Sequence, residues 1–364
     1  MNSFQTSIQS SIQSYGGDDW IQKYLGKKPL FTCVLGFTAT GLIEGISAAG
    51  ATPEARKFTA IADAEFLVMG KATQFPLPPL VAGVSPVFIS KAILSVLEIP
   101  ILVFDAGLPI PPTVEHISLG DAIAACMSTG KALPIEVVKK LFDQGLSWGE
   151  KLSQQADYLI LSECVVGGTT TALALLTALG YEAKNRVNSS LAVCNHQQKW
   201  QLVQQGLTGF DLAQLKLDPL ACVAAVGDPM QIVVAGMAIA ASRKVGVMLA
   251  GGTQMLAVYG LIKSLTKNKK IDFNKQNIIV GTTRWVAEDS TGDTLGLAKE
   301  IDVPLLATKL SFANSVYPQL QAYEKGFVKE GVGAGGTAIA ASLYQNWSLA
   351  QMVKQIEKLV LANL

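Results

Sequence analysis

The chain has 364 residues, of which 49% are hydrophobic and 16% are charged. A chain of this length has room for one large domain or two unequal ones, and its apolar content favours an α/β fold with parallel strands buried on both faces. The 29 Lys and Arg residues balance 28 Asp and Glu residues and are scattered, so no basic stripe is available to bind nucleic acid.

The cysteines, histidines and apolar segments exclude further classes of protein. The five cysteines show no Cys-x-x-Cys spacing and there are two histidines, so we expect buried thiols, no metal site and no cofactor. The first twenty residues do not resemble a secretory signal, which predicts a cytoplasmic protein. The apolar stretch 221–262 is interrupted by Asp228 and by Arg243 and Lys244. The resulting pieces are shorter than the roughly 18 residues of a membrane span, so we expect no membrane partner.

The predicted elements begin with residues 1–29, which read as helical. After them, short apolar runs end in Gly-containing turns and are followed by amphipathic stretches, which is the order of β–α units. Seven runs rich in Val, Ile, Leu or Phe predict parallel strands at 31–35, 65–69, 99–104, 157–161, 245–249, 277–280 and 304–308.

Helix signals lie between these runs and near the end of the chain. Thr52 caps a helix over 55–62, because Pro53 follows it at the first helical position. Apolar residues recur at helical spacing between 133 and 155 and again over 344–364. We therefore predict a doubly wound, mostly parallel, Rossmann-like α/β sheet domain over 30–343. The two terminal segments, 1–29 and 344–364, are predicted to form a small helical subdomain.

The clearest functional segment follows the predicted strand 157–161 and opens a helix. It contains Glu163, Gly167 and Gly168, followed by Thr169 and Thr170. Glycines allow backbone N–H groups to approach an anion, and the helix N-terminus adds its dipole. A tight strand-to-helix turn with Thr169 as cap explains the glycines equally well. The carboxylate at the end of a parallel strand favours a ligand site, because ligands bind there in open α/β sheets.

Two further glycine turns have the same character. Gly227 and Asp228 precede an apolar helical stretch, and Gly251, Gly252 and Thr253 follow the predicted strand 245–249. Each turn alone is weak evidence for a ligand. Together they would converge with the first turn at one edge of the sheet.

A fourth turn begins with an acid. Glu330 stands directly before Gly331 and Gly333, and a helix follows. A carboxylate beside an anion site is suited to proton transfer rather than to binding the anion. The alternative is a solvated acid that the helix dipole stabilises.

Two other residues follow predicted strands. Arg284 could clamp a carboxylate, or it could pack on the surface. Asp105 could contact a ligand hydroxyl, or it could cap the next turn. Contact with the substrate is therefore possible for both residues, and the sequence does not decide between these alternatives.

Taken in order, these segments resemble the nicotinate-nucleotide:dimethylbenzimidazole phosphoribosyltransferase family over about residues 100 to 345. Residues 162–170 are similar to the family's Gly-Glu-Met-Gly-Ile-Gly-Asn-Thr-Thr motif, and 330–334 to its Glu-Gly-Thr-Gly-Ala motif. Residues 103–107 and 218–229 are similar to two further family segments. The chain departs from the family at four positions, which is typical of a divergent archaeal and cyanobacterial branch: Val165, Gly168, Gly251 and Val332.

The resemblance implies a phosphoribosyltransferase of cobamide lower-ligand assembly. It would move the 5-phosphoribosyl group of nicotinate mononucleotide to a benzimidazole or purine base, with Glu330 as the catalytic base and the glycine turns around the nucleotide. It also implies a homodimer, for which the low charge fraction leaves room. Two alternatives remain: a nucleotide-binding homologue without catalysis, and another α/β transferase or hydrolase that acts on a phosphorylated small molecule.

Overall fold

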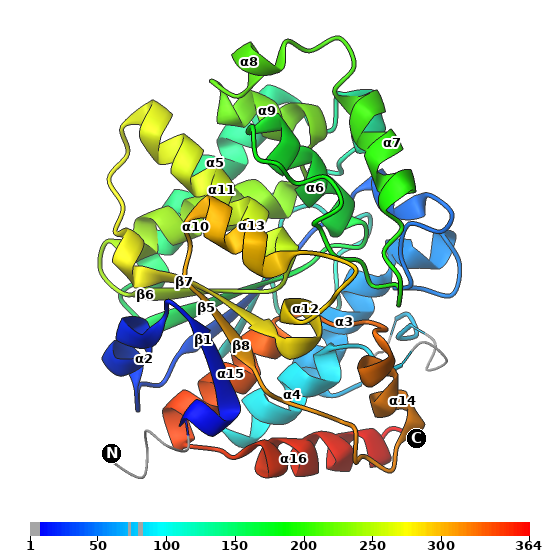
Figure 1. Ribbon diagram of the computed structural model, residues 1–364, viewed down its shortest axis with the longest axis vertical. Coiled ribbons are helices and arrows are strands. Elements are labelled where there is room, and N and C mark those ends of the chain that lie inside the picture. The colour runs from blue at the N-terminus through cyan, green and yellow to red at the C-terminus, as the bar shows by residue number, and fades with distance from the viewer. Residues whose placement is uncertain (1–7, 72–73, 79–82) are drawn as a thin grey trace.

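The computed structural model describes residues 8–71, 74–78 and 83–364, and its centre is an eight-stranded sheet (Figure 1). The strand order is β1-β8-β7-β6-β5-β2-β3-β4, and every pair is parallel except β1 with β8. The strands are β1 (Ile12–Tyr15), β2 (Leu30–Leu35), β3 (Ile101–Asp105), β4 (Ile117–Ser118), β5 (Tyr158–Cys164), β6 (Gly246–Ala250), β7 (Ile278–Thr283) and β8 (Leu305–Thr308).

Helices cover both faces of this sheet, because successive strand residues point to opposite sides and both sides are apolar. In β5, Leu159 and Leu161 face one layer, whereas Tyr158 and Ile160 face the other. The first layer contains α5 (Ile135–Leu152), α6 (Gly168–Ala178), α7 (His196–Gly206), α8 (Leu212–Leu215), α9 (Pro219–Val226), α10 (Pro229–Ser242), α11 (Thr253–Lys269) and α13 (Thr294–Ile301). The second contains α2 (Asp18–Tyr24), α3 (Thr59–Met69), α4 (Val87–Val96), α12 (Arg284–Ala287), α14 (Pro318–Gln321), α15 (Ala334–Gln345) and α16 (Leu349–Leu361). The predicted doubly wound, mostly parallel α/β fold is confirmed.

The strand order reverses between β2 and β5. The chain runs outward from β2 through β3 to β4, returns to place β5 on the other side of β2, and then continues outward to β8. The helices that follow β2 and β5 therefore diverge, and they leave a crevice at the carboxyl ends of these two strands. In open α/β sheets this is the point where ligands bind.

Two predicted elements were wrong. The run 65–69 lies within helix α3, where Phe66 and Leu67 are buried in the second layer. A short apolar run cannot distinguish a strand from one turn of a buried helix. In the amino-terminal segment, predicted to be helical, β1 instead pairs antiparallel with β8 as the edge strand. Its sequence, Ile-Gln-Ser-Tyr, is short and mostly polar and gave no strand signal.

The terminal segments lie against the main sheet in the described part of the chain. Through β1 the amino-terminal segment extends the sheet, and α16 packs against α4. Met352, Ile356 and Val360 of α16 belong to the same apolar layer as α4 and α15. The division into a domain over 30–343 and a terminal helical subdomain stays a prediction.

The apolar stretch 221–262 lies in the interior of the molecule. All residues of α10 are buried, and this helix packs between α5 and α11. Among the described residues, no helix is both long and apolar enough to cross a membrane.

Glycines allow α5 and α10 to cross in close contact. A Cβ on Gly145 of α5 would lie 2.5 Å from the carbonyl oxygen of Val233, and one on Gly236 of α10 would lie 2.7 Å from that of Phe142. Backbone atoms cannot move aside as a side chain can. The two helices therefore need these glycines to approach as closely as they do.

We predict that Gly145→Ala lowers the free energy of unfolding by about 1–3 kcal/mol, the usual cost of overpacking. Urea denaturation monitored by circular dichroism measures it. Ser147→Ala is the matched control, because Ser147 lies on the exposed side of the same helix and should change stability by at most about 0.5 kcal/mol. Equal stabilities of the two variants would contradict the close helix contact.

Candidate functional site

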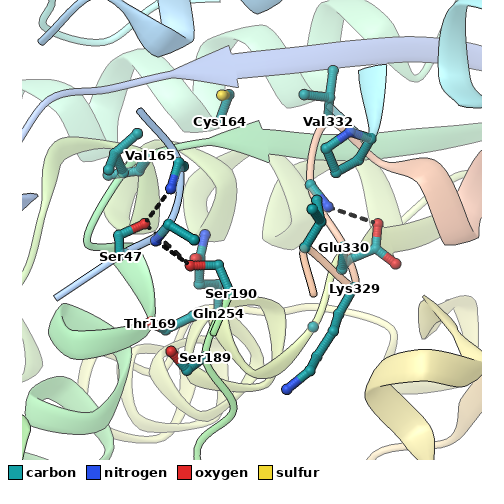
Figure 2. A pocket seen from close by; sticks show the side chains of 18 of the residues that line it. Ser47, Cys164, Val165, Thr169, Ser189, Ser190, Gln254, Lys329, Glu330 and Val332 are labelled. Atoms are coloured by element: carbon teal, nitrogen blue, oxygen red, sulfur yellow. Dashed lines mark hydrogen bonds between the residues drawn. The ribbon is translucent and has the colours of Figure 1, made fainter. Parts of the chain in front are cut away.

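A cavity with about 1020 Å³ of empty space, its open mouth included, lies at the carboxyl end of β5, beside the segment that follows β2 (Figure 2). It is lined by the turn after β5, by the start of α11, by residues 47–49 and 188–190, and by residues 328–332. Eight of the candidate site residues line this cavity: Glu163, Gly167, Gly168, Thr169, Gly252, Thr253, Glu330 and Gly331.

The turn after β5 leads directly into α6 at the cavity wall. Gly167 occupies the N-cap position with φ of 86°, and no side chain caps the helix there. A Cβ on Gly167 would lie 2.8 Å from the backbone nitrogen of Gly41. Gly167 is therefore required for two reasons: its backbone is left-handed, and the neighbouring 39–42 turn leaves no room for a side chain. Both reasons concern the packing of this turn itself.

The start of α11 presents a second helix N-terminus to the same cavity. Gly252 is its N-cap and makes no side-chain cap. The hydroxyl of Thr253 and the side-chain amide nitrogen of Gln254 are buried and have no hydrogen-bond partner within 3.5 Å among the described residues, although the Gln254 amide lies close enough to Glu163 to lower its pKa. Two uncapped helix N-termini and unpaired donors form a favourable environment for an anion.

Two buried lysines reinforce this positive character. Lys199 of α7 is fully buried and donates to the Thr169 hydroxyl at 2.9 Å and to the carbonyl of Asn188 at 2.5 Å. Burial, with a smaller contribution from nearby Lys329, lowers its pKa to about 8. Lys329 lines the cavity and pairs with Asp289 at 2.6 Å. An ammonium group that has no carboxylate partner among the described residues therefore lies directly behind the α6 turn.

The carboxylate of Glu330 is held by backbone N–H groups. Its Oε2 accepts from Thr283 at 2.9 Å and from Gly335 at 3.2 Å, and its Oε1 accepts from Gly331 at 3.1 Å. Burial raises the pKa of Glu330 to about 7, and the backbone donors act in the opposite direction. A pKa near neutrality suits a group that exchanges a proton at physiological pH.

The backbone around Glu330 is strained. Val328, Lys329 and Val332 have φ of 67°, 68° and 50°, which is unusual for non-glycine residues and most costly for a β-branched one. Three hydrogen bonds hold the segment: Thr283 Oγ1 donates to the carbonyl of Lys329, Ser90 Oγ to that of Val332, and the Val332 N–H to that of Glu163. Such strain persists where the surrounding structure enforces it, and it clusters at active sites.

A second carboxylate, Glu163, shares the buried environment. Its Oε2 accepts from the N–H of Val165 at 3.1 Å. Burial, together with the negative charges of Asp228 and Glu330, raises its pKa to about 8. Because like charges in one buried site oppose each other, we expect these acids to titrate as a coupled group.

Several residues singled out in the sequence do not line the cavity: Thr170, Gly227, Gly251, Gly333, Asp228, Asp105 and Arg284. Asp228 caps α10 and accepts from Thr171 Oγ1 at 2.6 Å. Asp105 accepts from the N–H of Gly107 at 2.8 Å, as a turn residue does. Arg284 donates to the carbonyl of Leu310 and pairs with Glu324 and Glu288. Its donors are thus engaged within the protein.

The cavity also contains polar residues that the sequence did not single out. Asp63 in α3 and Ser85 before α4 line one part of it, and Ser47 and Ser190 meet at 3.2 Å in another. Lys199 contacts Thr169 from behind. In the sequence Lys199 stands in a Gln-rich helix and resembles a solvated lysine. Only Asp63 carried a signal, as an acid within an apolar helical run.

Comparison with known proteins agrees with this architecture. Residues 91–268 match a family model described as phosphoribosyltransferase. A UPF0284 protein of Cyanothece sp. strain PCC 7425 is 61% identical over 352 residues, which cover 96% of each chain. A UPF0284 protein of Microcystis aeruginosa strain NIES-843 is 60% identical over 347 residues, which cover 94% of this chain and 96% of that one.

Two solved structures from Thermus thermophilus share the fold. The structure of CobT has a TM-score of 0.61 at 16% identity and covers 96% of this chain and 95% of that one. The structure of nicotinate-nucleotide-dimethylbenzimidazole phosphoribosyltransferase has a TM-score of 0.55 at 14% identity, with 97% and 94% covered. At these identities the likeness concerns the fold alone. Together with the family-model match, it confirms the resemblance to the nicotinate-nucleotide:dimethylbenzimidazole phosphoribosyltransferase family that the sequence motifs predict.

We predict that Gly167→Ala lowers the free energy of unfolding by about 2 kcal/mol or more, since a left-handed alanine costs about 1–2 kcal/mol and its Cβ would clash with Gly41. Gly252→Ala is the control, because its Cβ would meet only a Val286 methyl at 3.3 Å. Urea denaturation of both variants measures the difference. If Gly167→Ala is no less stable than Gly252→Ala, the backbone geometry assigned to this turn is wrong.

Proposed function

The chain belongs to the UPF0284 protein family, and from this premise we propose that it is a phosphoribosyltransferase that acts on a nucleotide and a heterocyclic base. In this proposal the 5-phosphoribosyl group of nicotinate mononucleotide passes to a benzimidazole or purine base and gives an α-ribosyl nucleotide. One observation carries the proposal: a single cavity joins two uncapped helix N-termini, with Lys199 behind them, to the carboxylate of Glu330.

The positive part of the cavity is suited to the 5′-phosphate. Thr169 lies at the start of α6, Thr253 and Gln254 lie at the start of α11, and Lys199 supports Thr169. Hydrogen bonds from helix N-termini and hydroxyl groups are the usual ligands of a phosphate, and a buried ammonium compensates its charge with little screening by water. We assign the nucleotide phosphate to this region.

Glu330 lies where the ribosyl carbon and the base would meet. The base attacks C1′ with a ring nitrogen, the C1′–N bond to nicotinate breaks, and nicotinate leaves with the bonding electron pair. The N–H proton of the attacking base passes to the carboxylate of Glu330. The backbone donors that hold Glu330 fix its oxygen atoms, so that the carboxylate is oriented before the base arrives.

The strained segment supports this assignment, because it determines where Glu330 points. Figure 2 shows Glu330 and Val332 on one side of the cavity and Thr169 and Ser189 in another part of it. A nucleotide that spans the two regions would present its sugar between them. The same arrangement would serve a homologue that binds nucleotide without catalysis, so turnover has to be measured.

We predict that Glu330→Gln retains the fold and the affinity for nicotinate mononucleotide and loses at least about 100-fold in kcat, the low end of general-base effects. Release of nicotinate in the presence of adenine or dimethylbenzimidazole measures it. A base with a pKa of about 7 is active when deprotonated. For the unaltered protein, kcat/KM therefore falls about tenfold per pH unit below pH 7, and it falls again above about pH 8 as Lys199 loses its proton.

Glu136→Gln is the matched control for this variant, because Glu136 is an exposed residue of α5 and does not line the cavity. It should keep full activity. Binding of nicotinate mononucleotide without nicotinate release by the unaltered protein would favour the non-catalytic alternative. An unchanged rate for Glu330→Gln would remove Glu330 from the mechanism.

We also predict that Lys199→Met raises the Kd of nicotinate mononucleotide about tenfold or more, since hydrogen bonds that involve a charged group contribute about 1.5–3 kcal/mol. Isothermal titration calorimetry measures the Kd. Lys140→Met, which replaces an exposed lysine of α5, should leave it unchanged. Equal affinities for Lys199→Met and the unaltered protein would place the phosphate elsewhere.

A further inference from the structure

A buried acid in the cavity has no part in the mechanism above. Asp63 of α3 is 4% exposed and lines the cavity. Its Oδ1 accepts from Ser85 Oγ at 2.6 Å, and its Oδ2 accepts from Cys164 Sγ at 3.4 Å. A hydroxyl and a thiol are neutral donors, and the thiol is a weak one.

Within the described residues, no cation pairs with Asp63. Burial raises its pKa to about 6, with the two donors acting in the opposite direction. A buried carboxylate without a cation is costly to the fold. Holding Ser85 in place does not need a carboxylate, since a neutral amide oxygen accepts the same hydrogen bond. Each carboxylate oxygen also retains capacity for a further donor.

Asp63 belongs to the same part of the cavity as Glu330. Both negative charges raise the pKa of buried Tyr323. Cys164, which donates to Asp63, follows Glu163 at the end of β5, and Figure 2 shows Cys164 and Val332 together at the side of the cavity away from Ser189. Asp63 therefore lies on the side of the cavity that the second helical layer forms, whereas the turn assigned to the phosphate opens α6 of the first layer.

The cavity also has apolar lining residues that suit a flat ring. Pro86, Val165 and Val332 line the cavity, and Pro86 lies against Gly331, where an added Cβ would meet its ring at 3.4 Å. A ring that fills this space and presents its reacting nitrogen to Glu330 would turn another edge toward Asp63. A hydrogen-bond donor on that edge could donate to the carboxylate of Asp63. A methyl group on that edge would add no hydrogen bond to it.

We propose that Asp63 selects the incoming base, and that the preferred base is a flat heterocycle with an N–H or O–H donor on the edge opposite its reacting nitrogen. This inference rests on the proposed function, because it assigns the base to the Glu330 region of the cavity. It deepens that function by naming the chemical class of the acceptor and the residue that recognises it.

The test compares pairs of bases that differ by one donor. Adenine against purine probes an exocyclic amino group, and 5-hydroxybenzimidazole against benzimidazole probes a hydroxyl group. For each base, kcat/KM is measured with nicotinate mononucleotide, and Kd is measured separately by equilibrium dialysis without it. We expect the donor-bearing member of at least one pair to be favoured about tenfold or more in both quantities, since a hydrogen bond to a charged group is at stake.

Asp63→Asn should reduce that preference to about twofold or less. The substitution should change kcat/KM and Kd only slightly for the base that lacks the donor. Thermal unfolding monitored by circular dichroism checks that the variant is folded. Asp143→Asn, on the exposed side of α5, is the matched control and should keep the preference of the unaltered protein.

The outcomes separate this inference from the proposed function. If no base releases nicotinate but the donor-bearing base binds more tightly and Asp63→Asn abolishes the difference, the inference holds and the transfer reaction is excluded. If nicotinate is released at equal kcat/KM with both members of each pair, the transfer reaction holds and the inference is overturned. A preference that Asp63→Asn leaves unchanged also overturns it, as does a failure of every base to bind.

Discussion

The carboxylate of Glu330 joins the end of β7 to the turn that leads into α15. It accepts hydrogen bonds from Thr283 at the end of β7, from Gly331 in the strained turn, and from Gly335 in α15. These contacts fix the turn that closes one side of the cavity, and the left-handed residues around Glu330 are tolerated because of them. An oxygen held in this way by backbone groups has little freedom to turn away from a substrate. The same turn is attached to the wall of the cavity at β5, because the N–H of Val332 donates to the carbonyl of Glu163.

The charges of the cavity are separated by the topology of the sheet. The helices that start after β5 and β6 bring their N-termini to one region, where Lys199 adds positive charge. The acids Glu330 and Asp63 come from the strained turn and from α3, which belong to the opposite helical layer. A substrate with a phosphate at one end and a proton-donating base at the other matches this division. The two layers of the fold therefore contribute different chemistry to one site.

The sequence predicted the sheet well, because central parallel strands are short, apolar runs followed by glycine turns. It also singled out the α6 turn and Glu330, which line the cavity, although a tight turn and a solvated acid were equally open explanations. It did not reveal β1, whose pairing depends on the edge of β8 rather than on its own residues, or the helical state of 65–69. Lys199 and Asp63 were missed because their burial cannot be read from the sequence. Each lies on a helix, and its charged side chain becomes buried only when other elements pack around that helix. The assignment of Asp228 to a ligand site rested on a glycine turn, whereas its carboxylate caps α10 and bonds Thr171.

A crystal structure of the protein with nicotinate mononucleotide bound would locate the phosphate and the ribose in the cavity. We expect the phosphate at the starts of α6 and α11, within hydrogen-bond distance of Thr169 or Thr253, and C1′ of the ribose facing the carboxylate of Glu330. A phosphate bound outside the cavity, or a ribose whose C1′ points away from Glu330, would contradict this expectation.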